Sequence, residues 1–252
     1  MKVLAVGDSH TQYFQLSNQV VVSYAPVRGI NCATKAVSAA SVTGIGKQSS
    51  TLNVASDVPK WIASFHPDFL VFNLGQVDIE LGLPYREYVK KDGIPAQEHM
   101  QSFIESYLSF LDRIDFPKHR IVVKGINLPV LCYDRLKAIK YINRIVTDRF
   151  TDSQEDKAQQ ASILANLREN YPSDIVRTDL AFLFNEMLQS AVTKAGYSYF
   201  DINADLVDEE TGLIKSEFVP AGFDHHLIDS VDVRALHWKR LLPVLRRQTW
   251  SS

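Results

Sequence analysis

Short apolar runs alternate with longer segments of helical period along this chain. Runs rich in β-branched and aromatic residues predict buried strands at residues 3–6, 20–24, 69–73, 121–126 and 197–202. Amphipathic patterns predict helices at residues 100–114, 133–150, 154–171, 178–195 and 229–247. Strands that alternate with helices are typical of a parallel sheet covered by helices on both faces, so we expect an α/β fold.

The chain is long enough to form one large domain. It has 252 residues, of which 46% are hydrophobic and 22% charged, an ordinary composition for a globular protein with a packed core. The polar stretch 151–160 lacks the proline and glycine content of an interdomain linker. We therefore expect a single domain over residues 1–252.

Charge and cysteine content restrict the partners and the cellular setting. A net charge of −2 and a pI near 6.4 disfavour binding to nucleic acid or to an anionic membrane. The two cysteines, Cys32 and Cys132, have neither metal-ligand spacing nor the density of a disulfide scaffold. The apolar run 3–6 is too short for a signal peptide, and no stretch approaches the ~20 apolar residues of a membrane span. We expect a cytoplasmic protein that needs no cofactor. A nucleotide-binding α/β protein is disfavoured because the chain lacks a glycine-rich phosphate loop.

Polar residues that directly follow the predicted strands mark the candidate site, because open parallel sheets bind ligands at the carboxyl ends of their strands. These residues are Asp8-Ser9-His10, Gly75-Gln76-Val77-Asp78, Asn127, Asp201 and Asn203.

Ser9 and a histidine near the C-terminus form a candidate catalytic pair. A serine hydroxyl becomes a good nucleophile only when a neighbouring base removes its proton, and histidine is the usual base. Ser9 follows the first predicted strand, and Asp224-His225-His226 precedes the last predicted helix. From the first segment alone, an alternative is that Asp8 or Ser9 only caps the next helix.

The order of these motifs resembles the SGNH/GDSL hydrolase family. Gly7-Asp8-Ser9-His10 is similar to the family's first block, Gly-Asp-Ser-Leu, and Asp224-His225-His226-Leu227 resembles its last block, Asp-x-x-His. Gly44 and Gly75-Gln76-Val77-Asp78 stand where the second and third blocks are expected. The resemblance spans nearly the whole chain and implies a flavodoxin-like three-layer sandwich. It also implies Ser9 as nucleophile, His226 as base, Asp224 as the acid that orients it, and the N–H groups of Ser9 and Gly44 as oxyanion donors.

Two positions depart from the family pattern. Val77 stands where the family has an asparagine that donates to the oxyanion, and losing such a donor costs about 2.7–4 kcal/mol of transition-state stabilisation. We therefore expect a side-chain amide to replace it, with Gln76 as first choice and Asn73 as second. Asp224 lies two residues before His226 instead of three, a spacing that still lets both face one way in an extended segment. His225 stays open as an alternative base.

His10, Asp78 and His225 are candidate substrate-binding residues. The alternatives are an ordinary polar residue on the first helical turn for His10 and a capping acid for Asp78. A metal cluster is an alternative interpretation of Asp224, His225, His226, Asp229 and His237. This set lacks an i, i+4 histidine pair and a coordinating glutamate motif, so we expect no metal there.

These residues together predict a serine-dependent ester hydrolase acting through an acyl-enzyme on a small or carbohydrate ester, such as an O-acetyl ester. Acyl transfer to a sugar hydroxyl in surface-polysaccharide biosynthesis is one alternative. A catalytically weakened domain that binds a glycan or a partner is the other, because Val77 and the irregular spacing of Asp224 and His226 weaken the match. The sequence leaves the oligomeric state open.

Overall fold

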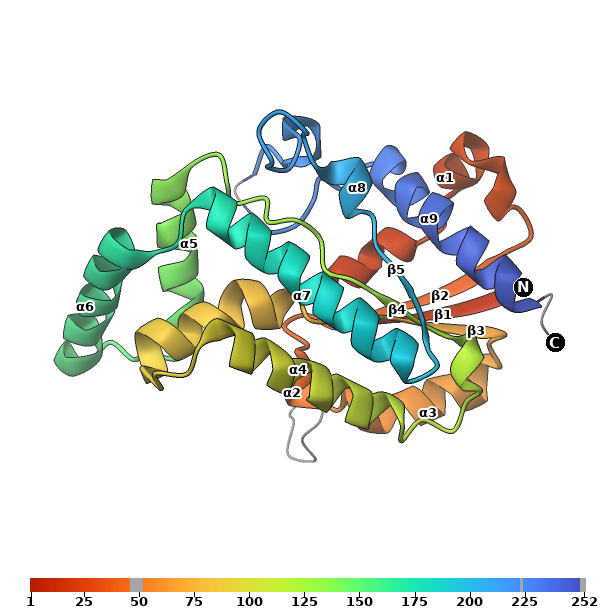
Figure 1. Cartoon of the computed structure of the whole chain (residues 1–252), viewed down its shortest axis with the longest axis horizontal. Coiled ribbons are helices and arrows are strands. Elements are labelled where there is room, and N and C mark those ends of the chain that lie inside the picture. The colour runs from red at the N-terminus through yellow and green to blue at the C-terminus, as the bar shows by residue number, and fades with distance from the viewer. Residues whose placement is uncertain (46–51, 223, 250–252) are drawn as a thin grey trace.

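A five-stranded parallel sheet forms the centre of the molecule (Figure 1). The computed structural model describes residues 1–45, 52–222 and 224–249. The strand order is β2-β1-β3-β4-β5, with every neighbouring pair parallel. The strands are β1 (Lys2–Gly7), β2 (Asn31–Ala36), β3 (Phe69–Asn73), β4 (Ile121–Lys124) and β5 (Ser198–Phe200). The predicted α/β class and four of the five predicted strands are confirmed.

The prediction of a strand at residues 20–24 is wrong. These residues lie mostly in helix α1 (Asn18–Ser23), where the Ser17 side chain accepts a hydrogen bond from the Val20 N–H and caps the first turn. Val20 is buried but Val22 is 76% exposed, as on a surface helix. The second strand is instead β2, an edge strand whose residues are only partly buried. Because it is not enclosed on both faces, β2 does not need the apolar run that marks the other strands.

Helices cover both faces of the sheet (Figure 1). On one face α4 (Ala96–Leu111) packs against α7 (Asp174–Lys194), with α3 (Val54–Phe65) beside them. On the other face α9 (Val231–Thr249) packs against α1 and against the 3-10 helix η1 (Ser9–Phe14). All five predicted helices are present with shifted ends, whereas α3 was not predicted.

Two further helices extend beyond the edge of the sheet. They are α5 (Arg135–Val146) and α6 (Gln154–Asn170), which pack on each other around a second apolar cluster that includes Ile139, Ile142 and Leu167 (Figure 1). Shorter elements complete the chain. They are α2 (Val42–Ile45), α8 (Asn203–Leu206), η2 (Ala25–Val27), η3 (Asp78–Gly82), η4 (Tyr85–Lys90), η5 (Lys118–Arg120) and η6 (Ser216–Phe218). None of the described helices combines the length and apolar character needed to cross a membrane.

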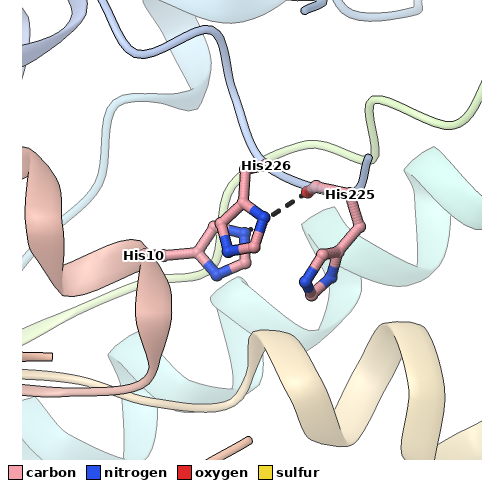
Figure 2. A group of neighbouring side chains, drawn as sticks. All are labelled: His10, His225 and His226. Atoms are coloured by element: carbon pink, nitrogen blue, oxygen red, sulfur yellow. Dashed lines mark hydrogen bonds between the residues drawn. The ribbon is translucent and has the colours of Figure 1, made fainter. Parts of the chain in front are cut away.

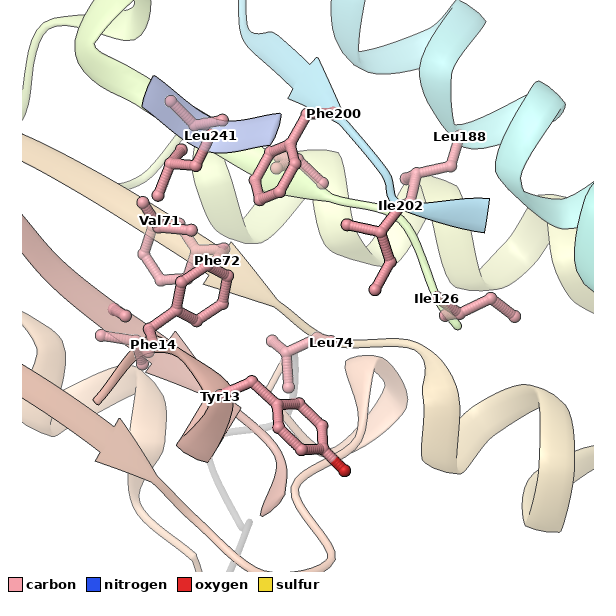
Figure 3. Packing of buried hydrophobic residues seen from close by; sticks show 14 of the residues in the cluster. Tyr13, Phe14, Val71, Phe72, Leu74, Ile126, Leu188, Phe200, Ile202 and Leu241 are labelled. Carbon is pink, nitrogen blue, oxygen red and sulfur yellow. The ribbon is translucent and has the colours of Figure 1, made fainter. Parts of the chain in front are cut away.

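The main core lies between the sheet and its covering helices (Figure 3). Phe72 of β3 meets Phe110 of α4 edge to face on one side of the sheet. On the other side Phe14 of η1 makes similar contacts with Phe200 of β5 and Trp238 of α9. This packing fixes η1 against the sheet, and with it the residues at the start of that helix.

The strand ends lie level at one edge, which is where the candidate site forms. Gly7 pairs with Asn73, and Asn73 pairs with Lys124. A Cβ atom on Gly7 would lie 1.9 Å from the Asn73 carbonyl oxygen, so only glycine lets β1 and β3 approach this closely. The residues that follow β1 are therefore held directly beside those that follow β3.

Candidate active site

Ser9 is the first residue of η1, immediately after β1. Asp8 caps this helix, since its Oδ1 accepts a hydrogen bond of 2.9 Å from the His10 N–H. The Ser9 hydroxyl is thus not used for capping. Instead, Ser9 Oγ lies 2.6 Å from His226 Nε2, a residue 217 positions away in the sequence.

His226 also contacts a carboxylate with its other ring nitrogen. Its Nδ1 lies 2.8 Å from Asp224 Oδ1, which gives a continuous chain from the hydroxyl through the imidazole to the carboxylate. Asp224 therefore reaches His226 across the shortened, two-residue spacing. This is the arrangement in which an imidazole can take a proton from a serine while the acid fixes its orientation.

The pKa values of this pair favour a neutral histidine beside an ionised acid. Burial lowers the pKa of His226 below its usual value, and the nearby His10 and His225 lower it further, against the opposing effect of Asp224. Burial alone would raise the pKa of Asp224, but the hydrogen bond from His226 and the charges of both histidines outweigh it and hold that pKa below the usual range. His226 can thus accept a proton at neutral pH.

His225, the alternative base, pairs with a different acid. Its Nδ1 lies 3.0 Å from Glu80 Oε2 on η3. Burial would lower the pKa of His225, but the hydrogen bond and charge of Glu80 outweigh burial and raise it. No hydrogen bond joins His225 to the Ser9 hydroxyl among the described residues, so the geometry favours His226 as the base. Sequence reasoning missed Glu80, which carries no motif signal and meets His225 only because the chain folds.

His10 lies against both of the other histidines (Figure 2). Its ring stacks on that of His226 with centroids 4.3 Å apart, and its Nε2 lies 3.3 Å from the His225 carbonyl oxygen. The ring is only 1% exposed. His10 therefore packs against the His226 ring, and its predicted role in substrate binding stays a prediction.

Two of the predicted oxyanion donors are already used within the protein. The Gly44 N–H donates to the Ser41 side chain and carbonyl, at 3.0 and 3.1 Å. The Gln76 amide forms a reciprocal pair with the Asn127 backbone, where Nε2 donates to the carbonyl at 3.2 Å and Oε1 accepts from the N–H at 2.7 Å. The predictions for Gly44 and for Gln76 as first choice are therefore corrected.

Two predicted donors keep an unused hydrogen. In the described part of the chain, the Ser9 N–H has no acceptor, and Asn73 Nδ2 is buried without a partner. Asn73 is tied to the Ser9 turn, because its carbonyl accepts from the Asp8 N–H at 3.1 Å. These are the two groups of the predicted set that remain free to donate.

The Asp78 carboxylate is hydrogen-bonded to the segment that carries Gly44. Its carboxylate accepts hydrogen bonds from the Val42 N–H at 2.7 Å and from the Thr43 N–H and hydroxyl at 3.2 and 3.1 Å. Burial raises the pKa of Asp78 to about 6, although these hydrogen bonds oppose the rise. Asp78 therefore anchors the segment that carries Gly44, and its binding of substrate stays a prediction.

Asn127 also forms a buried hydrogen bond. Its side-chain oxygen accepts a hydrogen bond of 2.8 Å from Nζ of the fully buried Lys124. Burial lowers the pKa of that amine to about 8. Together with the Gln76 pair, this contact fixes the loop after β4 beside the loop after β3.

A mostly apolar cavity of about 70 Å³ lies next to this loop pair, between η3, η4 and α7. Gln76, Glu80 and Asn127 line it, together with apolar residues such as Leu83 and Leu180. Neither Ser9 nor His226 does, so the cavity is separate from the Ser9 hydroxyl. Glu80 belongs to both regions because it lines the cavity and pairs with His225.

Solved structures of esterases share this fold. A putative acylhydrolase from Bacteroides fragilis NCTC 9343 superimposes with a TM-score of 0.52 at 9% identity, over 98% of this chain and 86% of that one. A catalytic mutant of Axe2, an acetylxylan esterase from Geobacillus stearothermophilus, gives 0.52 at 11% identity, over 97% and 93%. A carbohydrate acetylesterase family member from Sinorhizobium meliloti gives 0.50 at 14% identity, over 98% of both chains.

The chain therefore shares its fold with a putative acylhydrolase and with two acetyl esterases. No protein-family model matches the sequence, and no curated protein matches it either. At identities this low the likeness concerns the fold, and the chemistry has to be argued from the site itself.

Proposed function

We propose that this protein is a serine-dependent ester hydrolase in which Ser9, His226 and Asp224 form the catalytic triad. The observation that carries the proposal is the unbroken chain of contacts from Ser9 Oγ to His226 Nε2 at 2.6 Å and from His226 Nδ1 to Asp224 Oδ1 at 2.8 Å. The lowered pKa of His226 supports its role as base.

In this mechanism His226 takes the proton of Ser9 as its oxygen attacks the ester carbonyl. The Ser9 N–H and Asn73 Nδ2 are the donors proposed for the developing oxyanion. His226 then gives the proton to the departing alcohol, which leaves an acyl group on Ser9. A water molecule, deprotonated by His226, attacks this acyl-enzyme, and collapse of the second tetrahedral intermediate returns the proton to Ser9 and releases the acid.

The substrate class that we propose is an O-acetyl or other short-chain ester, with a carbohydrate as the alcohol. Two of the structural neighbours are described as acetylxylan or carbohydrate acetyl esterases, which supports this choice. A sugar hydroxyl in place of water in the second step would make the same site an acyltransferase. We also propose a cytoplasmic location, as the cysteine content predicts.

A second candidate is a weakened domain that binds a glycan or a partner without turning it over. The observation in its favour is that the Gly44 N–H and the Gln76 amide are both engaged within the protein. Such a domain would keep the fold and the Ser9–His226 contact, but its oxyanion site would be too poor for turnover.

A panel of aryl esters tests the two proposals against each other. We expect the wild-type protein to hydrolyse acetyl esters faster than butyryl or longer esters, and His226→Gln to lose most of that turnover. The exposed His119→Gln is the matched control and retains it. Absence of turnover with every ester, by a protein that still binds an acetylated oligosaccharide in calorimetry, would favour the binding domain.

A further inference from the structure

Three histidines converge at the candidate active site (Figure 2). His10 comes from η1, and His225 and His226 come from the segment before α9. One ring nitrogen from each lies within 4.8 Å of the others. The rings are in direct contact, with centroids 4.3 Å apart for both pairs that include His226.

A carboxylate stands beside the Nδ1 atom of each of these rings. The pairs are His226 with Asp224 at 2.8 Å, His225 with Glu80 at 3.0 Å and His10 with Asp8 at 3.3 Å. The last contact is not a hydrogen bond, and His10 Nδ1 is otherwise buried without a partner. Histidines that bind metals almost always have such an acceptor on the second ring nitrogen, because it fixes the tautomer and raises the basicity of the ligand. Three imidazoles alone do not indicate a ligand, but here two of them are hydrogen-bonded to a carboxylate through Nδ1, and the third has a carboxylate 3.3 Å from its Nδ1.

We propose that His10, His225 and His226 form a binding site for a divalent transition-metal ion such as Zn²⁺. Imidazole suits zinc, copper and nickel, and three histidines with one open position are a common zinc arrangement. Zn–N bonds of 2.0–2.1 Å place tetrahedral ligands about 3.4 Å apart, so the rings need small rotations to close on the ion. The two carboxylates of Asp224 and Glu80 add negative charge that favours a cation.

No sequence motif predicts this set of three histidines. The histidines that the spacing brings together are His225 and His226, whereas His10 lies 215 residues before His225 and joins them only through the fold. The expectation of no metal covered Asp224, His225, His226, Asp229 and His237, and the proposal departs from it at His225 and His226, whereas Asp229 and His237 take no part here. His237 is fully buried, and its Nδ1 contacts the Val233 carbonyl in α9.

The proposed site would regulate the proposed hydrolase through His226. Its Nε2 cannot bind a metal ion and also accept the proton of Ser9, so the metal-bound protein would be unable to activate its nucleophile. This consequence depends on the proposed function, whereas metal binding itself does not.

Calorimetric titration of ZnCl₂ into chelator-treated Ser9→Ala protein at a fixed pH tests the binding. We expect one Zn²⁺ per chain, with affinity at least 10-fold weaker in the same protein carrying His225→Gln or His226→Gln. Glu80→Gln should weaken it by about 10–100-fold, the usual effect of losing a carboxylate behind a metal-binding histidine. His119→Gln is the control and should leave the affinity unchanged. Absence of stoichiometric binding, or binding that neither histidine variant weakens, would overturn the proposal.

A second measurement separates this proposal from the proposed function. If the wild-type protein hydrolyses aryl acetates, Zn²⁺ should inhibit it and EDTA should restore the rate. Turnover that persists when the calorimetric site is saturated would overturn the inhibitory role. If no ester is hydrolysed, the proposed function fails while the calorimetric result for the metal site still stands.

Discussion

Gln76→Ala is predicted to destabilise the protein without removing its turnover of esters. Gln76 is 2% exposed, and its amide satisfies both polar groups of the Asn127 backbone, at 2.7 and 3.2 Å. Truncation to alanine leaves that N–H and that carbonyl without their present partner. A buried polar group that loses its partner costs about 1–3 kcal/mol, so the two together should lower the free energy of unfolding by about 2–6 kcal/mol.

The assay combines urea denaturation with turnover of an aryl acetate by the folded variant. We expect kcat to change by less than about 10-fold, because the lost contacts hold two loops together and do not reach the oxyanion. Gln101→Ala is a matched control, since this exposed glutamine donates only to Glu105 on the same helix and its removal should stay within about 0.5 kcal/mol of wild type.

The opposite result would refute this reasoning. If Gln76→Ala unfolds at the wild-type urea concentration while kcat falls by about 10²-fold or more, the amide serves the oxyanion and its contacts with Asn127 are incidental.

Two further predictions concern acids that the structure places in different roles. Asp224→Ala should remain folded and lower kcat by about 10²–10⁴-fold, because His226 loses the group that orients it; an unchanged kcat in steady-state assays would exclude that role. Asp78 has a folded-state pKa of about 6, above its unfolded value of 3.8, so folding takes up a proton between these pH values and stability falls as the pH rises through that window. That shift corresponds to about 3 kcal/mol in full, of which about 2.4 kcal/mol falls between pH 4 and pH 7, and Asp78→Asn should remove this part from the difference in unfolding free energy between the two pH values. An equal pH dependence in both proteins, measured by urea denaturation, would contradict the raised pKa.

The sequence predicts the buried elements of the fold much better than those at its edge. Strands β1, β3 and β4 are enclosed on both faces and therefore carry continuous apolar runs. The edge strand β2 lacks such a run, and the apolar residues 20–24 that seemed to provide it belong mostly to a capped surface helix. Local pattern cannot distinguish a short strand from a short helix when the deciding contacts are tertiary.

In the candidate site, too, residues in motifs could be predicted from the sequence, whereas contacts between distant segments could not. The positions of Ser9 and His226 follow from the order of the motifs, and the structure brings their side chains together. The partner of Gln76 is a loop 51 residues away, and that of His225 is Glu80, 145 residues away. Val77 shows that the asparagine donor of the family pattern is missing. The sequence does not determine which other amide is free to donate to the oxyanion.

Mapping a fluorophosphonate adduct tests the central claim most directly. This reagent captures only a serine that a neighbouring base has activated, so it reports on the Ser9–His226 contact without any assumption about the substrate. We predict that the wild-type protein gains one adduct in intact-protein mass spectrometry, that peptide mapping locates it on Ser9, and that His226→Gln reacts far more slowly. An unmodified protein, an adduct on another residue, or equal labelling of His226→Gln would contradict the account.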